Sequence, residues 1–186
     1  GWCYGGMIAY EMACQLKEAG EDMGSLILID TYIMNSDYDR KLVVVNQVEN
    51  INREYYENSP LFEDFRGRGM IEEIIENSRR VGRNMADFAP RTYAGRVHYF
   101  KATQIAENLS TSQRTYFAHI IREQAGGMEK FVPSHQLTIY DIPEHHDGMM
   151  SDAGRKVMSN RIRNIMGMEL LFLQADKLTN EQINKR

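Results

Sequence analysis

The chain is short of cysteine and proline and has no long apolar run, and each shortage narrows the class of protein. Its 186 residues include two cysteines, four prolines and one tryptophan. Two cysteines cannot build a disulfide framework, so a reducing cytoplasm suits the chain best. No run approaches about 18 consecutive apolar residues, and no basic-then-apolar segment resembles a secretion signal. We therefore expect a cytoplasmic protein with no membrane partner.

Basic charge is also scarce. The chain has 22 Lys and Arg residues against 26 Asp and Glu residues, a net charge of −4. Because no basic excess is available to neutralise phosphates, nucleic acid is not an expected partner. The hydrophobic content of 42% supports a packed core, and the length suits one domain or part of one.

The first six residues, 1–6, are the most informative stretch. They read G-x-C-x-G around Cys3, the pattern of a nucleophile elbow with cysteine in the place more often held by serine. The small residues Gly1 and Gly5 would let the backbone turn tightly. Residues 7–16 suit a helix, so the Cys3 thiol is predicted to lie at a helix N-terminus, where the dipole favours a thiolate. A glycine-rich turn beside a buried cysteine would give the same short pattern.

Two later segments place catalytic residue types at strand ends. The apolar run 25–29 predicts a buried parallel strand that ends in Asp30. Residues 136–142 predict the last strand, and the loop after it contains His145 and His146. Nucleophile, acid and histidine then follow the chain order of α/β-hydrolases. Because the carboxyl ends of parallel strands share one edge of a sheet, we expect the three groups to meet there.

Three segments resemble the thioesterase domains of nonribosomal peptide synthetase and polyketide synthase assembly lines. They are residues 1–11, 26–32 and 142–150. The resemblance implies an α/β protein with the α/β-hydrolase fold, in a variant with cysteine as the nucleophile. It also implies that residues 1–186 are the C-terminal part of one domain, starting at the elbow. The N-terminal strands and a loop with one oxyanion donor would then lie outside this sequence.

Acyl transfer needs a nucleophile, a base, a group that orients the base, and donors for the oxyanion. Here Cys3 would be the nucleophile, His146 the general base and Asp30 its orienting partner. The resemblance adds three expectations: the backbone N–H of Tyr4 as an oxyanion donor, and Trp2 and Met149 as substrate contacts.

His145 is the rival of His146. The family spacing between the proline after the last strand and the methionine pair selects His146, which leaves His145 as a loop residue. Cys14 and the other histidines are predicted to be packing or surface residues, and their spacing favours no zinc site; these histidines are His98, His119 and His135.

The remaining segments fill out the expected domain. Periodicity predicts helices over 42–55 and 70–81, with a short third helix leading to Ala89 and Pro90. The resemblance implies that residues 33–90 form a helical lid, and a plain helical insertion is the alternative. Further expectations are a strand over 95–102, a helix around 116–121 and a final helix capped by Asp152.

The resemblance implies a thioesterase that takes an acyl or peptidyl chain from a carrier protein and releases it by cyclisation or hydrolysis. The phosphopantetheine arm belongs to that carrier partner, so no bound cofactor and no metal are expected in this chain. The alternatives are a freestanding editing thioesterase, another cysteine hydrolase of the same fold, and a catalytically silent binding module.

Overall fold

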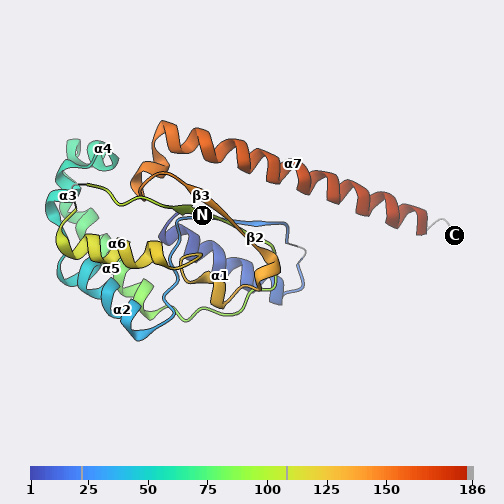
Figure 1. The fold of residues 1–186 in the computed structure, drawn as a ribbon, viewed down its shortest axis with the longest axis horizontal. Coiled ribbons are helices and arrows are strands. Elements are labelled where there is room, and N and C mark those ends of the chain that lie inside the picture. Colours follow the sequence, from blue (N-terminus) through green and yellow to red (C-terminus); the bar gives the residue numbers. More distant parts are fainter. Residues whose placement is uncertain (22, 108, 184–186) are drawn as a thin grey trace.

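A parallel sheet lies at the centre of the computed structural model, which describes residues 1–183 except 22 and 108, with side chains up to residue 167 (Figure 1). Its three strands are β1 (Leu26–Ile29), β2 (Val97–Ala102) and β3 (Leu137–Ile142), in the order β1-β2-β3. They are the three strands that the sequence predicts, and their register is parallel throughout. Their carboxyl ends therefore share one edge.

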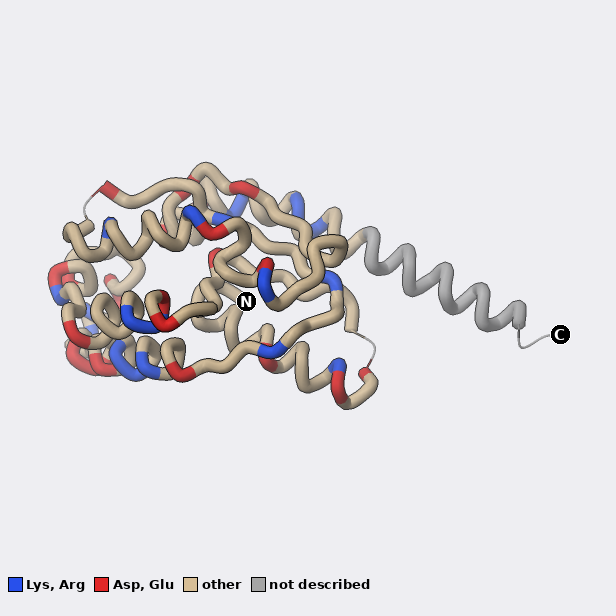
Figure 2. Tube along the Cα trace, turned by 60° about the horizontal axis from the view of Figure 1, so that its bottom comes forward, with Lys and Arg blue, Asp and Glu red and all other residues tan. Residues whose placement is uncertain are grey.

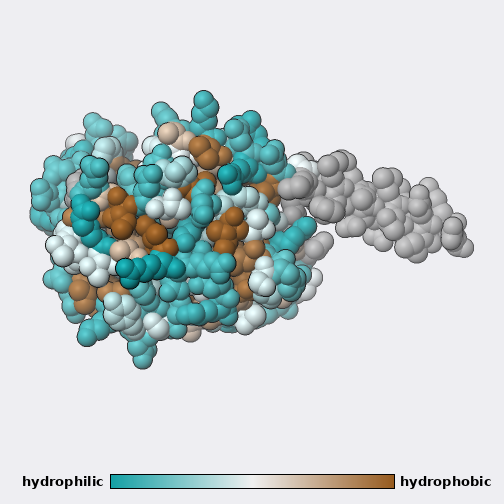
Figure 3. All heavy atoms as spheres, in the orientation of Figure 1, coloured by the Kyte–Doolittle hydropathy of each residue, from teal (hydrophilic) through white to brown (hydrophobic). Residues whose placement is uncertain are grey.

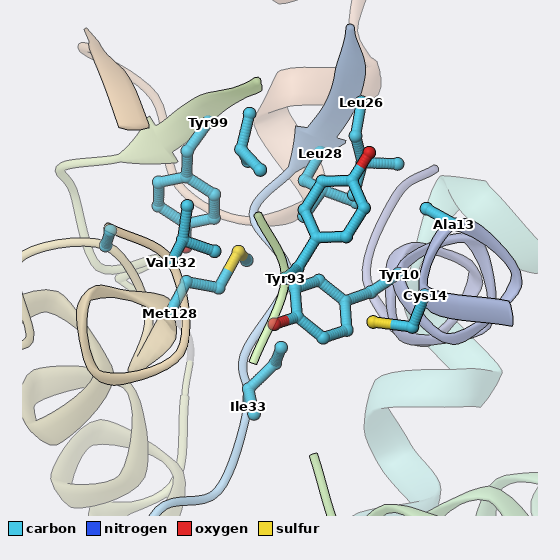
Figure 4. Close-up of a cluster of buried hydrophobic side chains, with 12 residues drawn as sticks. Tyr10, Ala13, Cys14, Leu26, Leu28, Ile33, Tyr93, Tyr99, Met128 and Val132 are labelled. Atoms are coloured by element: carbon cyan, nitrogen blue, oxygen red, sulfur yellow. The ribbon is translucent and has the colours of Figure 1, made fainter. Parts of the chain in front are cut away.

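Helices cover both faces of this sheet. Helix α1 (Tyr4–Glu18) packs on the face that carries Leu28 and Tyr99, as Figure 4 shows. Helix α7 (Asp152–Ile183) packs on the other face, where Phe100 and Ile142 meet Met158. Since successive side chains of a strand point to opposite faces, β2 supplies both layers with buried residues. Cys14, on the face of α1 that meets the sheet, is buried as predicted.

Residues 1–3 run beside β1 on the side away from β2. Trp2 forms a parallel bridge with Ile29, the Ile29 N–H donates to Gly1 O at 2.8 Å, and the Cys3 N–H donates to Ile29 O at 3.0 Å. The chain then turns directly into α1. The elbow is therefore held against the central sheet by backbone hydrogen bonds on its entry side.

The segment between β1 and β2 is helical, as predicted, but its helices are divided differently. The continuous helix expected over 42–55 is wrong: the segment forms α2 (Asp37–Val44), a wide π turn η1 (Val45–Glu49) and α3 (Arg53–Asn58). Ser36 caps α2 and Asn52 caps α3, so each short helix has its own start signal. The 3-10 turn η2 (Pro60–Phe62) and helix α4 (Glu63–Gly67) follow.

Helix α5 (Ile71–Asp87) is continuous through the segment where we expected a separate short helix before Pro90. Gly82 lets α5 approach η1, because a Cβ at residue 82 would lie 2.6 Å from the Gln47 Cβ. Helices α2 to α6 gather at one end of the molecule in Figure 1. Figure 2 shows acidic and basic residues interspersed along these helices. Their ion pairs, such as Arg53 with Glu57 at 2.7 Å, are exposed and contribute little stability each.

The remaining elements lie near the strand ends. Helix α6 (Thr111–Arg122) starts at a capping box formed by Ser110 and Gln113. Helix α7 is capped by Ser151, whose Oγ accepts from the Gly154 N–H at 3.2 Å, and not by Asp152 as predicted. Three short 3-10 turns complete the fold: η3 (Met128–Lys130), η4 (Ser134–Gln136) and η5 (Asp147–Met150).

Apolar side chains also reach the surface. Figure 3 shows them as separate patches between hydrophilic side chains on one face. Three exposed apolar side chains belong to α1: Ile8, Met12 and Leu16. None of the helices in the described part of the chain is long and apolar enough to cross a bilayer.

Candidate functional site

Two residues at the strand ends have strained backbones. Cys3, at the N-terminus of α1, has φ 52° and ψ −127°, and Asp30, directly after β1, has φ 40°. Among the described residues these are the non-glycine residues with positive φ. Such conformations cost about 1–3 kcal/mol each and cluster at functional sites. Strain at both positions supports the elbow pattern around Cys3.

Gly1 is sterically required in the elbow as predicted, but Gly6 takes the place predicted for Gly5. A Cβ at Gly1 would lie 2.4 Å from Gly5 O, so Gly1 is required. A Cβ at Gly5 would meet no atom within 4 Å, whereas one at Gly6 would lie 1.8 Å from Thr31 Oγ1. Gly6, rather than Gly5, lets α1 lie against the segment that follows Asp30.

We expect Gly6→Ala to destabilise the fold and Gly5→Ala to leave it intact. The methyl group at residue 6 collides with buried Thr31, and overpacking of this kind costs about 1–3 kcal/mol. Residue 5 lies inside α1 with free space around it, where alanine is favoured over glycine by up to about 1 kcal/mol. Urea unfolding of the two variants measures the difference, and equal losses of stability would contradict the placement of Gly6.

His146 lies beside Asp30. Its Nδ1 is 2.6 Å from Asp30 Oδ2, while Asp30 Oδ1 accepts from the Ala102 N–H at 3.0 Å. Both side chains are mostly buried. The carboxylate is thus fixed by β2 on one oxygen and holds the imidazole with the other, which leaves His146 Nε2 as the nitrogen available for proton transfer.

Cys3 and Asp30 control the charge of this imidazole. Burial by itself lowers the pKa of His146, but the charge of Cys3, hydrogen bonds with Asp30 and Cys3, and the charge of Asp30 outweigh it and raise the pKa well above its ordinary value. The protonated imidazole is therefore favoured while a thiolate is its neighbour. Cys14 differs: it is buried, and burial raises the pKa of its thiol.

A cavity of about 240 Å³ opens beside these groups. Its wall includes Cys3, Asp30 and His146, together with residues of η1, α3, α5 and α6. Trp2 stacks on the His146 ring with centroids 5.1 Å apart, and Phe117 of α6 lies 5.9 Å from the same ring. The imidazole thus contacts two aromatic side chains at the cavity wall.

Sequence reasoning missed Phe117 and Tyr55. Tyr55 donates a 2.7 Å hydrogen bond from its hydroxyl to Asp147 Oδ2 and so joins α3 to the loop that carries His146. No sequence signal links residues 92 positions apart in this way. Phe117 lay on a predicted helix, but helix periodicity alone does not say what that face meets.

The remaining predicted site residues lie in different surroundings. Trp2 lines the cavity. Met149 does not: it is completely buried and packs with Phe100 and Ile142 under α7, so its expected substrate contact is replaced by a core position. Tyr4 begins α1, and within the described residues its N–H donates to no backbone group, as usual for the first turn of a helix.

Three of the other histidines have structural contacts. His145 lines the cavity, and its Nδ1 accepts from the Gly148 N–H at 3.2 Å, within its own loop. His98 stacks on Tyr140. His119, expected to be an ordinary packing or surface residue, forms a second Asp–His pair, with Nε2 2.6 Å from Asp39 Oδ1. Neither member of that pair lines the cavity.

The family model for the thioesterase domain matches residues 1–134. No curated protein sequence matches the chain. Among solved structures, the NocB thioesterase domain from the nocardicin cluster is 21% identical with a TM-score of 0.55, over 90% of this chain and 63% of that one. This chain therefore spans less than two thirds of the NocB domain.

Two further structures have the same fold. A four-domain nonribosomal peptide synthetase bound to AMP and glycine is 19% identical with a TM-score of 0.57, over 89% of this chain and 14% of its own length. Human thioesterase 2 is 16% identical with a TM-score of 0.53, over 91% of this chain and 72% of its own. These likenesses confirm the predicted α/β-hydrolase fold.

Proposed function

Since the chain belongs to the thioesterase domain family, whose members are hydrolases, we propose that it cleaves thioesters through a triad of Cys3, His146 and Asp30. Its substrate is an acyl or peptidyl chain on the phosphopantetheine arm of a carrier protein, released by cyclisation or hydrolysis. The observation that carries this proposal is the 2.6 Å pair of His146 and Asp30 on the wall that also bears Cys3. The second Asp–His pair, Asp39 with His119, does not line that wall.

The residues present supply each step of acyl transfer. His146 Nε2 takes the proton of the Cys3 thiol, and the thiolate attacks the thioester carbonyl carbon. The Tyr4 N–H lies directly after the nucleophile and donates to the oxyanion. The tetrahedral intermediate collapses, the carrier thiolate leaves and takes the proton from His146, and the acyl group remains on sulfur.

Release repeats the sequence with a second nucleophile. His146 accepts the proton of water, or of a hydroxyl or amine within the acyl chain, as that group attacks the Cys3 thioester. The Cys3 thiolate then leaves. A thioester keeps the acyl group more activated than an oxoester would, so ring closure starts from a higher free energy than it would from a serine ester. Cysteine at this position favours release by a weak internal nucleophile.

Residues 33–90 serve as a lid in this proposal. They supply one side of the cavity through η1, α3, η2 and α5. The bond from Tyr55 to Asp147 attaches this segment to the loop of His146. A wall that excludes water would favour attack by the acyl chain itself over hydrolysis.

An acyl-pantetheine donor should leave a covalent adduct on Cys3. Mass spectrometry of the digested protein is expected to find the acyl mass on the peptide that contains Cys3 and none on the peptide with Cys14, whose buried thiol serves as an internal control. Cys3→Ala should abolish the adduct. An adduct elsewhere, or turnover that survives this substitution, would refute the proposed nucleophile. In a separate alkylation at neutral pH, Cys3 should react well ahead of Cys14, and equal reaction of the two thiols would favour a silent binding module.

A further inference from the structure

Carboxylates are the acidic groups of the cavity wall, and histidines are its basic groups. Within the described chain its lining includes no lysine and no arginine, and its carboxylates are Asp30 and Asp147. Asp30 is occupied on both oxygens, by the Ala102 N–H and by His146. Asp147 receives the Tyr55 hydroxyl on Oδ2 only, and no described donor bonds its Oδ1. One carboxylate oxygen beside the reacting groups is therefore free to accept.

A second acceptor lies on the same wall. Asn46 of η1 is 6% exposed, and its Nδ2 donates to Leu42 O at 2.9 Å. Its Oδ1 is buried and has no partner among the described residues. Buried acceptors without a donor cost about 1–3 kcal/mol, so each one calls for an explanation. A π turn within a helix is a common setting for functional groups, and this one brings Asn46 to the cavity.

We propose that the cavity selects acyl chains that carry a primary ammonium group, bound by Asp147, with Asn46 Oδ1 accepting an N–H of the same chain. The inference rests on the proposed function, because it names the substrate class of the same site. An ammonium supplies the donors that Asp147 Oδ1 lacks, and a charge-assisted hydrogen bond is about twice as strong as a neutral one. A carboxylate in the place of the ammonium would be repelled by Asp147.

Trp2 makes the proposal measurable without turnover. It is the single tryptophan of the chain, and it lines the cavity against His146. Its fluorescence can be titrated in the Cys3→Ala protein with pantetheine thioesters of equal length, 3-aminopropanoyl against butanoyl and 6-aminohexanoyl against heptanoyl. We expect the amine to bind about tenfold more tightly than its methyl analogue in at least one pair. Equal affinities, or no binding of either amine, would overturn the proposal.

Three further substitutions in the Cys3→Ala protein separate recognition from a structural role. Asp147→Asn should remove the preference, whereas Asp152→Asn should retain it, because Asp152 is 98% exposed on α7. Tyr55→Phe should retain or increase the preference, since it deprives Asp147 of its only described donor. If Asp147 merely fastened the lid, Tyr55→Phe and Asp147→Asn would lose the preference together, and that result would refute the subsite.

Failure of this inference is distinguishable from failure of the proposed function. Acylation of Cys3 by the neutral donors with no amine preference in binding would refute the subsite alone. An amine preference without acylation of Cys3 by any donor would leave the subsite standing and refute the triad chemistry.

Discussion

His146→Ala is expected to lower kcat/KM by about 10²–10⁴-fold, because it removes the base that takes the thiol proton and returns it to the leaving group. The imidazole is the group that Asp30 holds at 2.6 Å, on the cavity wall that also bears Cys3. Steady-state hydrolysis of an acyl-pantetheine thioester measures the loss. The decrease should lie in kcat, since the side chain acts in the chemical steps.

His145→Ala is the matched control. The His145 imidazole also lines the cavity, but its Nδ1 accepts a hydrogen bond from the Gly148 N–H. Its loss should cost less than about tenfold in kcat/KM, with any effect traced to the geometry of the loop. A larger loss of kcat/KM in His145→Ala than in His146→Ala would identify His145 as the base and contradict the proposed triad.

The sequence predicted the three strands, with Asp30 and His146 in the segments that follow two of them, because those signals are local. The run before Asp30 is short and apolar, as buried parallel strands are, and the G-x-C-x-G pattern at Cys3 is that of a nucleophile elbow. The preference for His146 over His145 came from the spacing within one loop that the resembling family has. In each case the argument needed only residues close together in the chain.

What the sequence could not show depends on contacts between distant segments. Asn46 reaches the cavity because η1 widens the helix where Gly82 of α5 packs against it, and no periodicity reveals that. Gly6 matters because of Thr31, which comes from another element. Met149 looked like a substrate contact by its place after the histidine. The turn η5 instead directs it into the core under α7.

Asp30→Asn tests the orientation of the base, and we expect it to lower kcat/KM by about 10⁴-fold, as loss of the carboxylate does in other triads. The Ala102 N–H would keep the amide oxygen of the new side chain, which turns the amide nitrogen toward His146. Nδ1 must then accept, and the imidazole proton moves to Nε2, where it blocks uptake of the thiol proton.

Asp39→Asn is the control, because Asp39 makes an equally short pair with His119, and neither residue lines the cavity. It should lower the free energy of unfolding but leave kcat/KM nearly unchanged, since neither Asp39 nor His119 lines the cavity. Steady-state kinetics and urea unfolding of both variants give the comparison, and equal losses of activity would show that the Asp30 pair has no special part in catalysis.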